Sequence, residues 1–184
     1  CLLSRGLGDV YKRQIVMGKS YKKNDFFYGE SGKPSIKELL NNKPIEFNVS
    51  HSENYALIAV TLSNKVGIDI QLMDFHIDYK KLSKRYFSEQ EYNELKKVHD
   101  DNKRDAFYRI WTQKESFVKA TGHGLKFGLK HFSILLDNHC KLGVEVVTPV
   151  PLKDSWFTYN LIEFDSYKTA LTTSTKNSEI ILHQ

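Results

Sequence analysis

VGIDIQL, residues 66–72, alternates strictly between apolar residues and small or polar ones. A period of two predicts a β-strand, because successive side chains of a strand point to opposite faces. One face would be apolar and would carry Val66, Ile68, Ile70 and Leu72. The other face would carry Gly67, Asp69 and Gln71. An acidic side chain on the free face of a strand is usually solvated, so Asp69 indicates chemistry only if partners are found elsewhere.

Helices are predicted directly after this strand, the first over Ile77–Phe87. Ser88 and Glu91 then have the spacing of a capping box, which predicts the start of a second helix. The longest helix is expected from about Asp101 to Thr121, ending at Gly122, which tolerates left-handed backbone.

Trp111, Glu115 and Lys119 lie four residues apart in the long helix, so they share one stripe of its surface. Alone, an acid and a base one helical turn apart predict only a surface ion pair.

Before residue 66 the chain is basic and rich in turns, and Ser31–Pro34 predicts a tight turn that presents Lys33. Two β-rich runs follow, Ile45–Val49 and Tyr55–Leu62, joined by a polar connection that contains Ser50 and His51. Ser63–Lys65 is the predicted boundary between one lobe, residues 15–65, and a second lobe, residues 66–184. Four strands are predicted after the long helix: His131–Leu136, Leu142–Val147, Phe157–Glu163 and Tyr167–Thr173. The predicted fold class is α+β.

The composition narrows the class of protein. The chain has 184 residues, of which 40% are hydrophobic, enough for a buried core. Its longest uncharged run, Tyr55–Asn64, is about half the length needed to span a bilayer. Two cysteines, Cys1 and Cys140, exclude a disulfide framework and favour a cytoplasmic location. The net charge of +5 suits an anionic partner without choosing between nucleic acid, an acidic protein and a phosphorylated ligand.

Residues 1–14, CLLSRGLGDVYKRQ, show no strand or helix periodicity and no apolar core of a signal peptide. The string resembles a peptide that arises when sequencing-adapter DNA is translated. We therefore treat residues 1–14 as foreign to the fold and expect the N-terminal lobe to be incomplete.

Four blocks occur in a fixed order: GKP at 32–34, FNVSHS at 47–52, VGIDI at 66–70 and WTQKESFVKATGHGL at 111–125. In residue type, spacing and order they resemble the 4′-phosphopantetheinyl transferases of the Sfp type. The resemblance implies a monomeric pseudo-dimer of two similar α+β lobes, with coenzyme A and Mg²⁺ in the cleft between them. It also implies the reaction, in which the phosphopantetheine arm of coenzyme A moves to a serine of an apo acyl or peptidyl carrier protein. Adenosine 3′,5′-bisphosphate is released.

The resemblance assigns roles to particular residues. The metal ligands would be Asp69 and Glu115, with Gln71 standing where family members usually have Glu. Glu115 would take the proton from the carrier serine, and Lys119 would neutralise or protonate the departing phosphate. The contacts to coenzyme A would be made by Lys33, Pro34, Ser50, His51 and Lys119.

Three points stay open. Lys114 is either structural or directed at a phosphate. Tyr21–Gly29 interleaves lysines with aromatic residues, as single-strand nucleic-acid binders do, although the chain has no RNA-recognition or zinc-finger signature. Gln71 is also compatible with an impaired relative that only binds the carrier protein. The transferase interpretation predicts neither a nucleic-acid partner nor a membrane partner.

Overall fold

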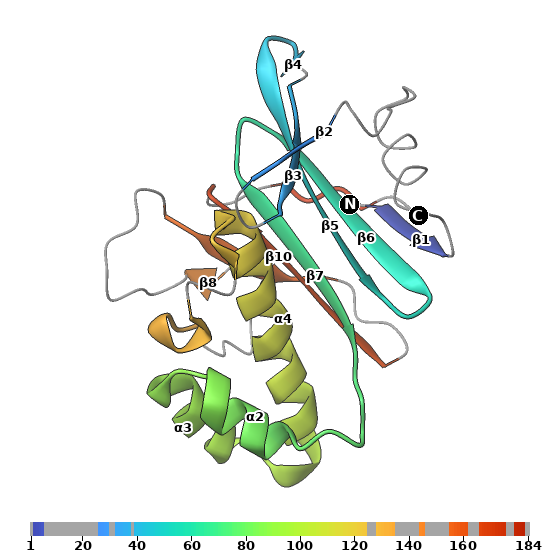
Figure 1. Cartoon of the computed structure of the whole chain (residues 1–184). Helices are drawn as coiled ribbons and strands as arrows, with labels where there is room; N and C mark the ends of the chain where they lie inside the picture. Colours follow the sequence, from blue (N-terminus) through green and yellow to red (C-terminus); the bar gives the residue numbers. More distant parts are fainter. Residues whose placement is uncertain are drawn as a thin grey trace.

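The computed structural model describes residues 2–5, 26–29, 32–37, 39–124, 128–134, 144–145, 155–161, 166–175 and 179–182. These residues form two four-stranded antiparallel sheets, in the orders β1-β6-β5-β4 and β7-β10-β9-β8, and a small hairpin, β2-β3. The strands are β1 (Leu2–Arg5), β2 (Phe26–Tyr28), β3 (Pro34–Ile36), β4 (Leu39–Leu40), β5 (Lys43–Ser52), β6 (Tyr55–Leu62), β7 (Val66–Leu72), β8 (Val144–Glu145), β9 (Phe157–Asn160) and β10 (Tyr167–Thr173). The helices are α2 (Tyr79–Tyr86), α3 (Glu89–Lys97) and α4 (Lys103–Thr121) (Figure 1). The predicted α+β class is confirmed.

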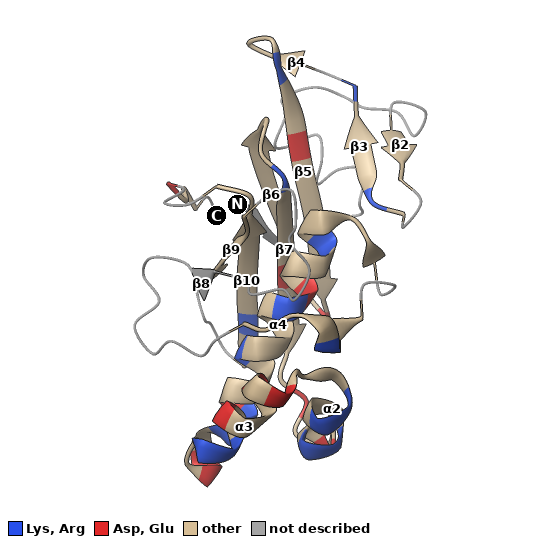
Figure 2. Ribbon diagram, turned by 90° about the vertical axis from the view of Figure 1, so that its left-hand side faces the viewer, with Lys and Arg blue, Asp and Glu red and all other residues tan. Residues whose placement is uncertain are grey.

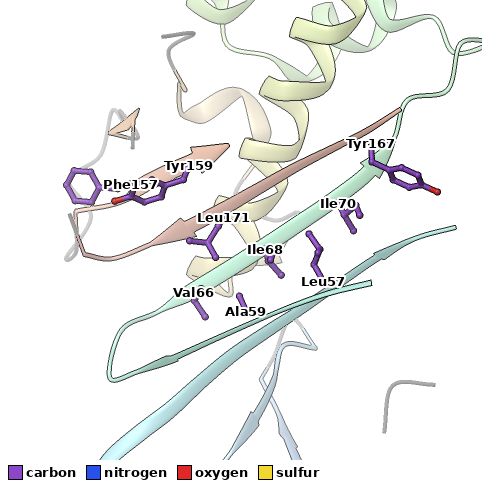
Figure 3. Close-up of a cluster of buried hydrophobic side chains, with 9 residues drawn as sticks. All are labelled: Leu57, Ala59, Val66, Ile68, Ile70, Phe157, Tyr159, Tyr167 and Leu171. Atoms are coloured by element: carbon purple, nitrogen blue, oxygen red, sulfur yellow. The ribbon is translucent and has the colours of Figure 1, made fainter. Parts of the chain in front are cut away.

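The main core lies between the two four-stranded sheets. The apolar face of β7 packs there, as the alternation of residues 66–72 predicts, against Leu57 and Ala59 of β6 (Figure 3). Phe157 and Tyr159 of β9 extend the same cluster. Helix α4 covers the opposite face of the second sheet, where it packs on β7 and β10. The strand β7 is therefore buried on both sides, with Asp69 on the side of the helix.

Helices α2 and α3 lie beside one end of α4 (Figure 1) and form a second core with it around Phe87, Phe107 and Ile110. The predicted capping box at the start of α3 is present: the Ser88 hydroxyl accepts from the Glu91 N–H, and the Glu91 carboxylate accepts from the Ser88 N–H. Helix α4 ends as predicted at Gly122, which has a φ of 73°. Local sequence signals thus set the ends of these helices.

Residues 2–5 belong to the segment that we treated as foreign, and they form β1, which pairs with the edge of β6. Two sequence-based predictions are wrong. The connection predicted to hold Ser50 and His51 belongs to β5, which continues to Ser52. The strand predicted over His131–Leu136 does not begin at His131. Residues 129–131 form a 3-10 turn, and the chain after it is extended. The strand predicted over Leu142–Val147 lies largely outside the described residues.

Gly67 sets the distance between β7 and α4. A Cβ atom at this position would lie 2.1 Å from the Ser116 carbonyl oxygen and 2.3 Å from the Ala120 nitrogen. Both are backbone atoms of α4 and cannot move aside without moving the helix. Only glycine therefore allows the approach that brings the polar face of β7 against α4.

Gly67→Ala is expected to lower the free energy of unfolding by about 3 kcal/mol or more, because the added methyl group forces the strand and the helix apart. Chemical denaturation followed by circular dichroism measures this change. Gly29→Ala is the control, since its Cβ would be 3.8 Å from the nearest atom, the Lys33 carbonyl oxygen; we expect a change within about 0.5 kcal/mol. Equal effects of the two substitutions would contradict this role of Gly67.

Candidate active site

Asp69 is the centre of a polar cluster between β7 and α4. Its side chain is buried, and its Oδ1 atom accepts hydrogen bonds from Lys119 Nζ at 2.6 Å and from Ser50 Oγ at 3.0 Å. Its other oxygen, Oδ2, is buried and has no hydrogen-bond partner among the residues that the structure describes. Buried carboxylate oxygens rarely lack a partner, so Oδ2 is the atom of this cluster best placed to accept a ligand.

Glu115 precedes Lys119 by one turn of α4 and is half-buried. Burial raises the pKa of the Glu115 carboxyl above its ordinary value, and the negative charge of Asp69 raises it further, while Lys119 opposes both effects. Figure 2 shows acidic and basic ribbon segments next to one another on α4, beside β7. The electrostatic influence of Asp69 on Glu115 agrees with two carboxylates that serve one site.

Gln71 follows Asp69 by two residues and shares its face of β7. Its Nε2 atom donates to the Leu72 carbonyl oxygen at 3.3 Å. The side-chain oxygen of an amide can bind a hard cation, but it adds no charge. Asp69 and Gln71 thus share one face of β7, and Glu115 lies on α4, close enough to Asp69 for their charges to interact.

The donor set fits Mg²⁺, which prefers oxygen ligands and commonly uses one or two protein carboxylates together with substrate phosphates and water. The unpartnered Oδ2 of Asp69 supplies one such oxygen. Within the described ranges no group of three or more His, Cys, Asp or Glu side chains is arranged for metal binding.

Lys119 is the cation of the cluster, and its side chain is 29% exposed. Besides Asp69, its ammonium group donates to Ser50 Oγ at 2.8 Å. An ammonium group has three protons, so these two contacts leave one donor for another acceptor. Asp69, Ser50 and Lys119 are thus directly hydrogen-bonded to one another.

Lys33 and Pro34 occupy a different position from this cluster. Lys33 follows the turn at Gly32, as predicted, but its ammonium group points inward and donates to the carbonyl oxygens of Val66 at 3.0 Å and Ala120 at 3.2 Å. The pKa of Lys33 is lowered by burial. Pro34 begins β3 opposite Tyr28. Lys33 therefore joins the β2-β3 hairpin to the last turn of α4.

His51 is exposed, and it alternates with the buried Ser50 and Ser52 along β5. Its side chain thus points away from the face that meets β7. Among the described residues it makes no hydrogen bond to Asp69, Glu115 or Lys119. The structure separates His51 from the carboxylates, and its contact with coenzyme A remains a prediction.

Lys114 is structural. Its fully buried ammonium group donates to both Glu91 oxygens at 2.7 Å and to the Phe132 carbonyl oxygen at 2.8 Å. Burial lowers the pKa of Lys114 to about 8, although Glu91 acts in the opposite direction. Glu91 also accepts from the Ile134 N–H at 2.7 Å. The pair holds α3, α4 and residues 132–134 together, which answers the question that the sequence left open.

Two residues of β5 that support β7 were given no individual role in the sequence analysis. Asn48 and Ser52 are buried in β5 and accept hydrogen bonds from the N–H groups of Ile68 at 2.8 Å and Leu72 at 3.0 Å. Their spacing of four within an otherwise β-rich stretch was the available signal, because it places both on the face that carries Ser50.

The sequence analysis also considered nucleic acid and membranes as partners. The candidate nucleic-acid segment, Tyr21–Gly29, lies mostly outside the described residues. No helix in the described part of the chain combines the length and apolar character needed to cross a bilayer.

Comparison with known proteins identifies the family. Residues 65–172 match the model of the 4′-phosphopantetheinyl transferase superfamily. The chain belongs to this superfamily. It is 36% identical over 148 residues to the 4′-phosphopantetheinyl transferase ffp of Bacillus subtilis, covering 76% of this chain and 61% of that protein. It is 31% identical over 134 residues to the transferase AcpT of Escherichia coli, covering 69% of this chain and 67% of AcpT.

The transferase HetI of a Nostoc species is 39% identical over 100 residues, which cover 54% of this chain and 42% of HetI. The chain therefore spans between about two fifths and two thirds of the length of these transferases. The region that matches the superfamily model contains Asp69, Gln71, Glu115 and Lys119. It does not contain Lys33, Ser50 or His51.

For this phosphopantetheinyl transferase homologue, Lys33→Met is expected to lower the free energy of unfolding by about 1–3 kcal/mol, because two buried carbonyl groups lose a charged donor. Thermal and chemical denaturation measure the loss. Lys43→Met, on the exposed end of β5, is the control and should change stability by no more than about 0.5 kcal/mol. Unchanged stability of Lys33→Met together with weaker binding of coenzyme A would show that Lys33 serves the ligand instead of the fold.

Proposed function

We propose that the protein transfers the 4′-phosphopantetheine group of coenzyme A to a serine of an apo carrier protein in a Mg²⁺-dependent reaction. Membership of the superfamily supports the reaction class. The observation that carries the proposal is the buried Asp69 carboxylate. Lys119 and Ser50 hold one of its oxygens, and the other has no partner within the described ranges. Oδ2 of this carboxylate can bind a metal ion, and the ammonium group of Lys119 beside it can bind a phosphate.

Asp69, Glu115 and Gln71 would hold Mg²⁺. When bound, the ion would neutralise charge on the phosphates of coenzyme A and help to orient them.

Glu115 is the group of this chain that would accept the serine proton. In the reaction, the serine oxygen forms a bond to the phosphorus that carries the pantetheine arm, and the bond from that phosphorus to the bridging oxygen breaks. Adenosine 3′,5′-bisphosphate leaves with the bridging oxygen. The Glu115 carboxylate would take the proton directly or through a water molecule.

Lys119 would stabilise the leaving phosphate. Its ammonium group donates two of its protons in hydrogen bonds to Asp69 and Ser50. The third proton is left to bind or protonate a phosphate oxygen. Of the residues proposed to contact coenzyme A, Ser50 and Lys119 lie in the cluster, and His51 adjoins Ser50 in the chain. The carrier partner would be an acyl or peptidyl carrier protein.

Glu115→Ala is expected to slow transfer by about 100-fold or more, because the proton acceptor and one proposed metal ligand are both lost. The measurement is the intact mass of an apo acyl or peptidyl carrier protein after incubation with the protein, coenzyme A and Mg²⁺. Glu89→Ala is the matched control, because Glu89 is exposed in the first turn of α3. It should transfer at the rate of the unaltered protein. No gain of phosphopantetheine with the unaltered protein would contradict the proposal and favour a relative that only binds the carrier.

Gln71→Glu is expected to lower the Mg²⁺ concentration needed for half the maximal rate by about 3–10-fold, since the change adds a negative charge to the proposed metal site. Gln90→Glu introduces the same charge on the exposed surface of α3 and should leave the Mg²⁺ dependence unchanged. Lys168 lies opposite Gln71 in the β7-β10 ladder, but it already forms an ion pair with Asp105, so the new carboxylate would not have this lysine to itself. An unchanged Mg²⁺ requirement for Gln71→Glu would contradict a ligand role for this position.

A further inference from the structure

A row of side chains from β5 supports one edge of β7. Asn48, Ser50 and Ser52 alternate along β5, and each accepts a hydrogen bond from a backbone N–H of β7. The three donors are Ile68, Ile70 and Leu72. The other edge of β7 pairs with β10. Alternate N–H groups of a strand point to opposite edges, so the β5 side chains take the place of a neighbouring strand.

Ser50 differs from the other two residues because it also contacts the proposed metal site. A serine hydroxyl has one proton and two acceptor positions. Ser50 Oγ accepts from the Ile70 N–H at 3.3 Å and from Lys119 Nζ at 2.8 Å. Both acceptor positions are filled by groups that can only donate, so its single proton points to Asp69 Oδ1, 3.0 Å away.

This arrangement fixes which oxygen of Asp69 is available. Oδ1 receives two donors, Ser50 and Lys119, whereas Oδ2 receives none from the described part of the chain. Loss of the Ser50 hydroxyl would leave Oδ1 with Lys119 alone, and that cation would also lose one of its acceptors. The carboxylate would then be less firmly held, since a buried side chain is oriented by the groups that hydrogen-bond to it.

We propose that Ser50 is a positioning residue for the metal site, which orients Asp69 by donating its only proton to Oδ1 and so directs Oδ2 to the cation. This inference rests on the proposed function only in that a divalent cation binds at Asp69. It differs from the contact with coenzyme A that the family resemblance assigns to Ser50, because it acts through a protein carboxylate and requires no coenzyme. Metal binding between β7 and α4 would then depend on the position of a side chain from β5, Ser50.

The test compares Ser50→Ala with Ser52→Ala in the full 184-residue chain. Both variants remove a β5 hydroxyl that accepts from a β7 N–H, but only Ser50 contacts Asp69. The probe is Mn²⁺ alone, without coenzyme A or carrier protein, followed by electron paramagnetic resonance of the free ion. We expect Ser50→Ala to weaken Mn²⁺ binding about 10-fold, as loss of an outer-sphere partner does. Ser52→Ala should stay within about 2-fold of the unaltered protein.

Ser50→Cys is a second variant of similar size, and its thiol is a weaker donor than a hydroxyl. Its Mn²⁺ affinity should lie between those of the unaltered protein and Ser50→Ala, so the test holds even if the alanine variant does not fold. Unchanged Mn²⁺ affinity of the Ser50 variants, or an equal loss in Ser52→Ala, would overturn the inference. Absence of Mn²⁺ binding by the unaltered protein would instead overturn the metal site of the proposed function.

Discussion

The close contact of β7 with α4 at Gly67 is the constraint on which the site depends. Because a Cβ atom there would lie 2.1 Å from the Ser116 carbonyl oxygen, the strand and the helix can touch only if this residue lacks a side chain. Two residues further along β7, the same face carries Asp69, and Lys119 of α4 reaches it across the interface. A larger separation of β7 and α4 would break this hydrogen bond. Gly67 therefore affects the polar cluster by allowing the short distance between the strand and the helix.

Polar contacts on two sides help to fix the position of α4. On the sheet side, Ser116 hydrogen-bonds to Thr172 at 2.7 Å, and Gln113 donates to Asn160 at 2.9 Å. On another side, the buried Lys114 contacts Glu91 of α3. A buried polar group that loses its partner is costly, so a rotation or slide of the helix would leave several groups unsatisfied at once. The helix is thus held in one register, which keeps Lys119 opposite Asp69.

The sequence predicted those features that are determined locally. The alternation of residues 66–72, the capping box at Ser88 and the left-handed Gly122 each depend on a few neighbouring residues, and all three are confirmed. The position of Ser50 was not predictable in this way. It looked like part of a polar connection because its partners, Ile70, Asp69 and Lys119, are distant in the chain. The inward direction of Lys33 likewise depends on carbonyl groups of β7 and α4 that come together only in the fold.

The charges of the site explain why a cation suits it. Asp69 and Glu115 bring two carboxylates to one ammonium group, Lys119, and burial raises the pKa of both carboxyls. Removal from water costs an ionised carboxylate much of its hydration, and Lys119 compensates for only part of that loss. A divalent cation at Asp69 Oδ2 would favour the ionised form of both groups and return part of the lost stabilisation. The burial that disfavours the free carboxylates therefore favours a positively charged ligand, and the phosphates of an incoming substrate would then meet two cations, the metal ion and Lys119, instead of Lys119 alone.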